Sequence, residues 1–197
     1  MTRALVVHCH PLDTCYIAAV RDRVLAGLER AGATWRLRDL YRTGFVPELS
    51  ADEHRAHLEP GAHPSLADDV DDLRWCDTLI LVYPTWWAGQ PAMLTGWFDR
   101  VWANGVAWEL PEGTDRPLPR LGHVRRIVAV TTHGSSKLVN ALEGEGGKRV
   151  VTRTLRSMCG WRTRTSWIAL YGIDTCSDKH RIEFLDRVER RIERLTT

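Results

Sequence analysis

Three short stretches of this sequence combine polar and aromatic residues in a way that suits a planar, anionic ligand. Residues 84–88, Pro-Thr-Trp-Trp-Ala, offer flat apolar rings beside backbone amides, which fits a heteroaromatic ring. Residues 8–16, His-Cys-His-Pro-Leu-Asp-Thr-Cys-Tyr, carry candidate ligands for a metal or an anion. Residues 131–136, Thr-Thr-His-Gly-Ser-Ser, offer hydroxyls and amides for a polar ring edge. The alternative for this last stretch is a solvated turn.

The first of these stretches in the chain admits two kinds of ligand. A metal site on His8, Cys9 and His10 would need a distant contributor, because no further ligand follows at suitable spacing, so we expect no metal. If a helix begins near Thr14, its hydroxyl, the nearby N–H groups and the positive helix end form an anion site suited to a phosphate. The alternative is that Thr14 simply caps the helix.

Common nucleotide and hydrolase motifs are missing. No G-x-G-x-x-G follows a strand, and neither a phosphate-binding P-loop nor the nucleophile pattern G-x-S-x-G is present. The glycine-rich run 144–147 does not directly follow a predicted strand and is a weak signal.

The elements that must position the three stretches follow from hydrophobic periodicity and capping residues. Ser50 with Glu53 and Ser65 with Asp68 have the spacing of a capping box, so a helix is expected to begin at each serine. Residues 41–49, the excursion 105–120, the segment 132–137 and residues 140–147 are expected to be irregular. Strands are predicted at 3–8, 35–38, 79–83, 124–132 and 163–171, and further helices at 16–31, 90–104, 148–159 and from 177 onward.

Strands alternating with helices predict an α/β fold, a doubly wound five-stranded parallel sheet of order 2-1-3-4-5 with helices on both faces. We expect one domain over residues 1–197. In this order the loops after the first and third strands meet at the switch point where such sheets bind ligands. The sheet would therefore bring the candidate stretches together.

The composition limits the class of protein. A net charge of +2 without blocks of like charge makes nucleic acid an unexpected partner. No apolar run is long enough for a membrane span, and the first apolar run is too short for a signal peptide. Five cysteines without C-x-x-C spacing then suggest reduced thiols and a cytoplasmic location.

The stretch 83–102, YPTWWAGQPAMLTGWFDRVW, resembles the flavodoxin-like NAD(P)H:quinone reductases, including the modulator-of-drug-activity-B and mammalian types. The stretches 6–16, VVHCHPLDTCY, and 129–135, AVTTHGS, match at family positions. The resemblance implies a flavodoxin-like fold with non-covalent FAD or FMN, NADH or NADPH as donor, a quinone-like acceptor and a homodimer.

The resemblance also implies where the flavin lies. Its phosphate would lie at the start of the first helix, its ring against the 84–88 loop, and the polar end of the ring at the loop after the fourth strand. The residues so implied are His10, Thr14, Cys15, Tyr16, Pro84, Thr85, Trp86, Trp87, Ala88, Thr131, Thr132, His133 and Gly134.

Three departures from the family pattern bear on activity. The family loop usually begins Thr-Thr-Gly-Gly, and His133 replaces the first glycine. The Tyr and His that assist hydride transfer in mammalian-type enzymes correspond to Val139 and about Glu145, so no catalytic side chain is assigned. Cys15 stands where many relatives have Ser.

We therefore expect a flavin-dependent NAD(P)H oxidoreductase that reduces a quinone or similar two-electron acceptor in a ping-pong cycle. The alternatives are a flavin-bound electron carrier or a regulatory subunit without quinone turnover. Trp97 and Trp102 are interpreted as core and dimer contacts, and with the excursion 105–120 they are the reason for expecting a homodimer.

Overall fold

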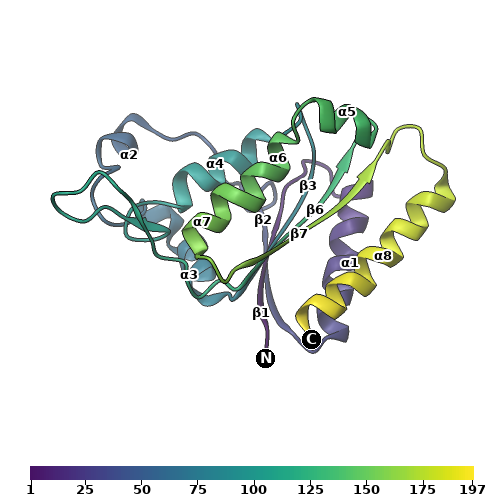
Figure 1. Ribbon diagram of the computed structural model, residues 1–197. Coiled ribbons are helices and arrows are strands. Elements are labelled where there is room, and N and C mark those ends of the chain that lie inside the picture. Colours follow the sequence, from purple (N-terminus) through teal and green to yellow (C-terminus); the bar gives the residue numbers. More distant parts are fainter.

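The computed structural model describes residues 1–197 and contains one five-stranded parallel sheet of order β2-β1-β3-β6-β7 (Figure 1). Numbered along these five strands alone, this is the predicted order 2-1-3-4-5. The chain runs in the order β1 Arg3–His8, α1 Tyr16–Arg30, β2 Thr34–Asp39, α2 Ala51–Arg55, α3 Ala67–Trp75, β3 Thr78–Pro84, α4 Ala92–Val101, β4 Trp108–Glu109, β5 Leu118–Pro119, β6 Arg126–His133, α5 Lys137–Leu142, α6 Gly146–Arg149, α7 Arg156–Cys159, β7 Arg164–Tyr171 and α8 Asp178–Thr196.

The central strands are apolar along their whole length because helices cover both faces of the sheet. Helices α1 and α8 lie on one face, and α3, α4, α6 and α7 lie on the other (Figure 1). Alternate residues of β1 serve the two sides: Val6 packs in the core under α1 and α8, and Val7 packs in the opposite core. Each face of the sheet therefore has its own hydrophobic core beneath a layer of helices.

Helix α1 shows how sequence signals set element boundaries. It begins at Tyr16 and ends at Arg30, and Gly32 follows with a φ of +64°, a left-handed value that glycine adopts without strain. Gly27 lets α8 approach closely, since a Cβ there would lie 2.7 Å from the Glu189 carbonyl oxygen. The predicted range was therefore correct to one residue.

Two local predictions on the way to β3 had different outcomes. Ser50 and Glu53 form the predicted capping box at α2. Ser65 does not cap a helix: His63 Nδ1 accepts from the Ser65 N–H, and Pro64 begins a 3-10 turn that leads into α3 at Ala67. Proline suits the first turn of a helix, and here it moves the start of the element ahead of the serine.

Three irregular segments hold more order than the sequence suggested. The excursion 105–120 contains a two-stranded antiparallel ribbon, β4 with β5. Ser136 caps the short helix α5, whose residues fall partly in segments expected to be irregular. Residues 146–159 form one helical stretch, α6 and α7 joined by a π-helical segment at Val150–Leu155, slightly longer than the predicted 148–159.

Trp97 is fully buried and Trp102 is 7% exposed, both in the core beneath α4. The prediction that they belong to the core is correct, but neither is free to contact another subunit. The Trp97 indole N–H donates to Asp69 Oδ1 at 2.8 Å. Burial raises the pKa of this aspartate, and the hydrogen bond opposes that rise. None of the helices combines the length and apolar composition needed to cross a membrane.

Candidate flavin site at the carboxyl edge of the sheet

The loops that follow β1, β3 and β6 meet at one edge of the sheet, as predicted. The ring of His10, after β1, lies 6.3 Å from the ring of Trp86, after β3. The Thr85 N–H donates to the Thr132 carbonyl oxygen at 2.8 Å, and Thr85 Oγ1 lies 2.9 Å from Thr131 Oγ1. The three candidate stretches therefore lie next to one another at this edge of the sheet.

The amino end of α1 keeps unpaired amides beside this edge. Cys15, not Thr14, is the N-cap residue, and no side chain caps the helix. The Tyr16 and Ile17 N–H groups consequently have no acceptor within the chain. Of the two interpretations of Thr14, simple capping is wrong. What remains is a helix end with free donors and a partial positive charge, which attracts anions.

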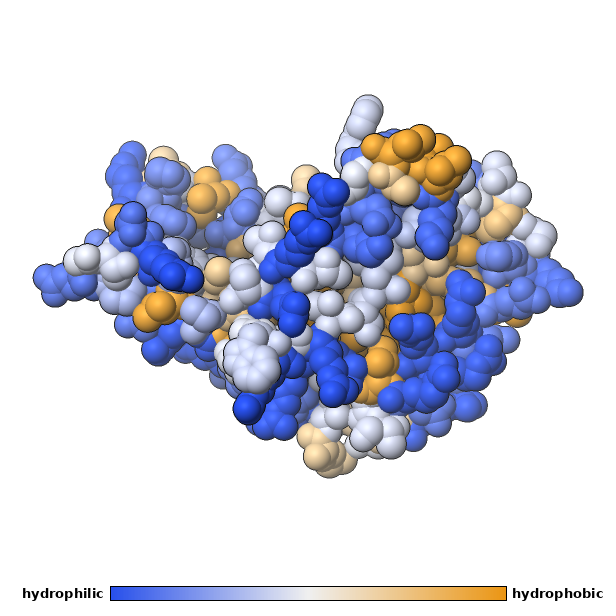
Figure 2. Space-filling view, viewed as in Figure 1, coloured by the Kyte–Doolittle hydropathy of each residue, from blue (hydrophilic) through white to orange (hydrophobic).

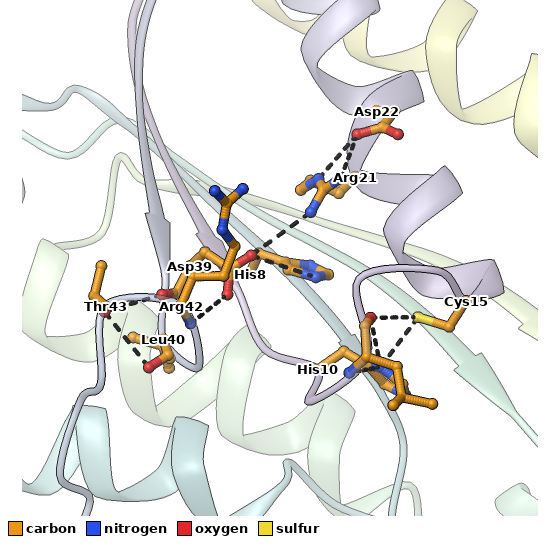
Figure 3. A network of polar contacts seen from close by, with 10 residues as sticks. His8, His10, Cys15, Arg21, Asp22, Asp39, Leu40, Arg42 and Thr43 are labelled. Atoms are coloured by element: carbon orange, nitrogen blue, oxygen red, sulfur yellow. Dashed lines mark hydrogen bonds and ion pairs between the residues drawn. The ribbon is translucent and has the colours of Figure 1, made fainter.

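Side chains within the first loop hold its shape. Cys15 Sγ lies 3.0 Å from His10 Nδ1 and 3.1 Å from the Leu12 carbonyl oxygen (Figure 3). The Leu12 N–H donates to the same histidine nitrogen at 3.1 Å. Tyr16 points elsewhere, because its hydroxyl donates to the Arg181 carbonyl oxygen at 2.8 Å, and burial raises its pKa to about 12. Tyr16 can offer an amide to an anion, but its hydroxyl is already engaged.

The aromatic loop after β3 is a tight turn with two residues in the left-handed region. Trp86 and Gly89 exchange backbone hydrogen bonds of 3.2 and 3.0 Å, while Trp87 and Ala88 have φ values of 51° and 57°. Such a conformation costs about 1–2 kcal/mol for each non-glycine residue. Strain of this kind concentrates at functional sites. The turn leaves the N–H groups of Trp87 and Ala88 without partners and the Trp87 ring fully exposed.

A brace from a distant segment holds this turn. The Gly147 N–H donates to the Ala88 carbonyl oxygen at 3.0 Å, and a Cβ at Gly147 would lie 3.3 Å from Gly89 Cα. Gln90 Nε2 donates to the Tyr83 hydroxyl at 3.1 Å and to the Gly147 carbonyl oxygen at 2.9 Å. Sequence reasoning missed this brace; the adjacent glycines of the 144–147 run were the available signal.

The loop after β6 buries a histidine next to the aromatic loop. The His133 ring stacks on Tyr171 with 4.5 Å between centroids and an interplanar angle of 18°. Its Nε2 lies 3.4 Å from Thr85 Oγ1, and its Nδ1 is buried without a partner. Burial lowers the pKa of this imidazole, whereas Asn140 and the Glu145 carboxylate act in the opposite direction.

A second polar cluster lies where β1 and β2 end, under α1 (Figure 3). His8 Nε2 lies 4.0 Å from Asp39 Oδ2, which is 3.6 Å from Arg21 Nη1. Burial lowers the pKa of His8 to about 4 against the opposing effect of Asp39. His8 is therefore neutral at pH 7, and Arg21 balances the carboxylate. No group of three or more His, Cys, Asp or Glu side chains is arranged to hold a metal.

The structure thus brings together the loops that carry all the expected site residues. Thr14, Trp86 and Trp87 are exposed, while Thr131, Thr132 and His133 are buried at the end of β6. A Cβ at Gly134 would come within 2.8 Å of Asp174 Oδ2, so glycine is needed for this close approach. The arrangement offers a helix end with free amides, a flat aromatic face and buried polar side chains along one line of loops.

Comparison with known proteins assigns the class. The family model described as the flavodoxin-like fold matches residues 2–194. NAD(P)H dehydrogenase (quinone) 1 of Cavia porcellus is 24% identical over 216 residues, with 99% of this chain and 78% of that protein covered. The uncharacterized NAD(P)H oxidoreductase YcaK of Escherichia coli is 30% identical over 162 residues, with 81% and 77% covered. The chain belongs to the flavodoxin-like family of NAD(P)H oxidoreductases.

Solved structures share the fold. An NAD(P)H:quinone oxidoreductase from Methanothermobacter marburgensis superposes with a TM-score of 0.83 at 23% identity, covering 100% of this chain and 98% of that chain. An FMN-dependent NADH-azoreductase from Bacillus anthracis, described in complex with FMN, gives a TM-score of 0.75 at 13% identity, with both chains covered completely. These structures show the flavodoxin-like fold, and the sequence relatives above make this chain an oxidoreductase.

Proposed function

We propose that this oxidoreductase binds FMN or FAD non-covalently at the three loops and uses it to pass electrons from NADH or NADPH to a quinone-like acceptor. The observation that carries the proposal is the junction of a helix end with free amides and an exposed aromatic turn. The relatives named for quinone reduction and the azoreductase described with FMN support the same assignment.

The residues present fit a flavin by their chemistry. The free N–H groups of Tyr16 and Ile17 suit its phosphate, the Trp86 and Trp87 rings suit an apolar planar face, and the free amides of the turn suit a polar ring edge. The residues that would hold it are His10, Thr14, Cys15, Tyr16, Pro84, Thr85, Trp86, Trp87, Ala88, Thr131, Thr132, His133 and Gly134.

A bound flavin supplies hydride acceptance from the nicotinamide and two-electron donation to the acceptor, in a ping-pong order. The chain supplies position and environment. The Trp87 ring offers a stacking surface, the brace at Gly147 fixes the turn, and the Thr85 hydroxyl, which contacts the buried Thr131 hydroxyl, offers a polar group. These groups bind and orient, and none needs to form a covalent bond.

Titration with FMN and FAD tests the binding proposal. We expect one flavin to bind with a submicromolar dissociation constant, and extraction of the purified protein followed by chromatography to identify which one. Micromolar or weaker binding of both flavins would contradict the proposal.

Steady NADH or NADPH oxidation with a quinone, and without a partner protein, distinguishes the enzyme from an electron carrier. A flavin-bound protein without turnover on any quinone or azo acceptor would favour a regulatory subunit.

We also propose a homodimer, but through a surface other than the one first expected. An apolar patch lies over α5, at the top of the view in Figure 2, where Leu138 and Leu142 are 70% and 80% exposed beside Val139. Exposed apolar patches of this kind commonly mark protein contacts. Light scattering at micromolar concentration should give twice the chain mass, and Leu138→Ser with Leu142→Ser should lower it to that of one chain. A wild-type monomer would contradict this proposal.

A further inference from the structure

His133 is a buried titratable side chain with an unused nitrogen beside the proposed flavin site. The residue is 6% exposed, and its Nδ1 has no hydrogen-bond partner. Buried polar atoms without a partner are uncommon and destabilise the fold. Packing alone does not account for such an atom, because an apolar side chain of similar size would fill the space without this penalty.

The surroundings of His133 can accommodate both the neutral and the protonated imidazole ring. Tyr171 stacks on one face, and Trp167 lies 6.0 Å from the ring centroid. A small cavity beside the imidazole is also lined by Asn140, Glu145 and Lys148. Glu145 and Lys148 form an ion pair of 2.8 Å. The other carboxylate near this loop is that of Asp174, which lies against Gly134.

These groups act on the imidazole in opposite directions. Burial lowers the pKa of His133, so the free protein holds the ring neutral at pH 7. The Asn140 side chain and, after it, the Glu145 carboxylate raise the pKa and favour the protonated ring. A further negative charge nearby would therefore shift the balance toward protonation.

A chain of side-chain contacts links His133 to the aromatic loop. Its Nε2 lies 3.4 Å from Thr85 Oγ1, and Thr85 Oγ1 lies 2.9 Å from Thr131 Oγ1. When Nε2–H donates to Thr85, Nδ1 is the free base and can accept a proton. A change of charge at the loop would then act on His133 over a short, mostly buried path.

We propose that His133 takes up one proton when the flavin bound at these loops is reduced, and thereby compensates the negative charge that the site gains. This inference rests on the proposed function. The nicotinamide supplies a hydride, which is two electrons and one proton, so the site gains one negative charge. A proton from hydronium or a buffer acid in the solvent binds His133 Nδ1 and restores the balance; no other bond forms or breaks at this residue. His133 is thus a positioning residue, which acts through Thr85 and through its charge.

Redox titration of the flavin-bound protein with dye mediators between pH 6 and 8 tests the proposal without turnover. Each proton bound per two electrons changes the equilibrium tenfold per pH unit, or about 30 mV. We expect the midpoint potential of the wild type to fall by about 59 mV per pH unit, which is two protons. His133→Gln and His133→Gly should give about 30 mV. His123→Gln, which removes a histidine remote from the site, should keep the wild-type slope.

Two results would overturn the inference: a wild-type slope of about 30 mV, or a slope near 59 mV in the His133 variants, which would place the second proton elsewhere. If the variants fail to fold or to bind flavin, ¹⁵N NMR of the wild-type imidazole decides. Two protonated ring nitrogens in the reduced protein and one in the oxidised protein are expected at pH 7, and an unchanged ring refutes the proposal. A protein that binds neither FMN nor FAD overturns the proposed function as well, whereas a flavin-bound protein with the lower slope overturns this inference alone.

Discussion

Removal of the Trp87 ring should separate ligand binding from protein stability. The side chain is fully exposed and its backbone is left-handed, with φ at 51°. Trp87→Ala therefore removes no buried contact, and the free energy of unfolding should change by less than about 0.5 kcal/mol. Trp87→Gly also relieves about 1–2 kcal/mol of backbone strain, offset by about 0.4–1 kcal/mol of chain entropy, so stability should rise slightly.

Flavin affinity should move in the opposite direction. Stacking of a nucleic-acid base on an aromatic side chain contributes about 1–3 kcal/mol, and a flavin ring of similar character should lose a comparable amount. At 1.4 kcal/mol per tenfold, the dissociation constant of FMN or FAD should rise roughly 5- to 150-fold in either Trp87 variant, and further in Trp86→Ala with Trp87→Ala. Flavin fluorescence titration and urea unfolding measure the two effects.

Trp161→Ala is the matched control, because this tryptophan is 79% exposed and precedes β7 at the opposite edge of the sheet. It should change neither measurement. If alanine at both Trp86 and Trp87 leaves flavin affinity unchanged, the assignment of the aromatic loop to the flavin ring is wrong.

Two further predictions concern stability. Gly96→Ala should destabilise the protein by about 1–3 kcal/mol in urea unfolding, because its Cβ would overlap the backbone of Pro47. Gly122→Ala is the control and should have little effect, because the space around Gly122 is open. Equal stabilities of the two variants would contradict the packing of α4. The pKa of His8 is about 4 in the folded protein and about 6.5 in the unfolded chain, so the unfolded chain binds a proton at the higher pH. The contribution of His8 to the free energy of unfolding is therefore lost as the pH falls from about 6.5 toward 4. His8→Asn should weaken that pH dependence, and an unchanged profile would show that Asp39 or other groups control it.

The sheet could be predicted because its signals are local and agree with one another. The fully apolar β3 indicates burial on both faces, and Gly32 marks the end of α1. With five strands and alternating helices, the handedness of the connections leaves few orders, and the switch point then brings the three loops together. That order also makes β3 and β6 neighbours, which is the basis of the contact between Thr85 and Thr132.

Features that depend on distant residues could not be predicted. The stacking of His133 on Tyr171 joins two strands, and nothing within either segment indicates it. The N-cap of α1 is Cys15, one residue after Thr14, and this depends on the backbone geometry of the loop. The interpretation of Trp102 as a subunit contact was wrong for a related reason, since an apolar stripe does not specify what covers it.

The brace between Gly147 and Ala88 has a consequence for the kinetics of ligand association. Because the turn is fixed in its strained form by a segment far along the chain, little conformational entropy remains to be lost when a planar ligand arrives. Flavin binding should therefore occur in one step, with an observed rate that rises linearly with flavin concentration and shows no plateau. Loosening the brace with Gln90→Ala should introduce a slow, concentration-independent phase, as the loop must first find the shape it otherwise keeps.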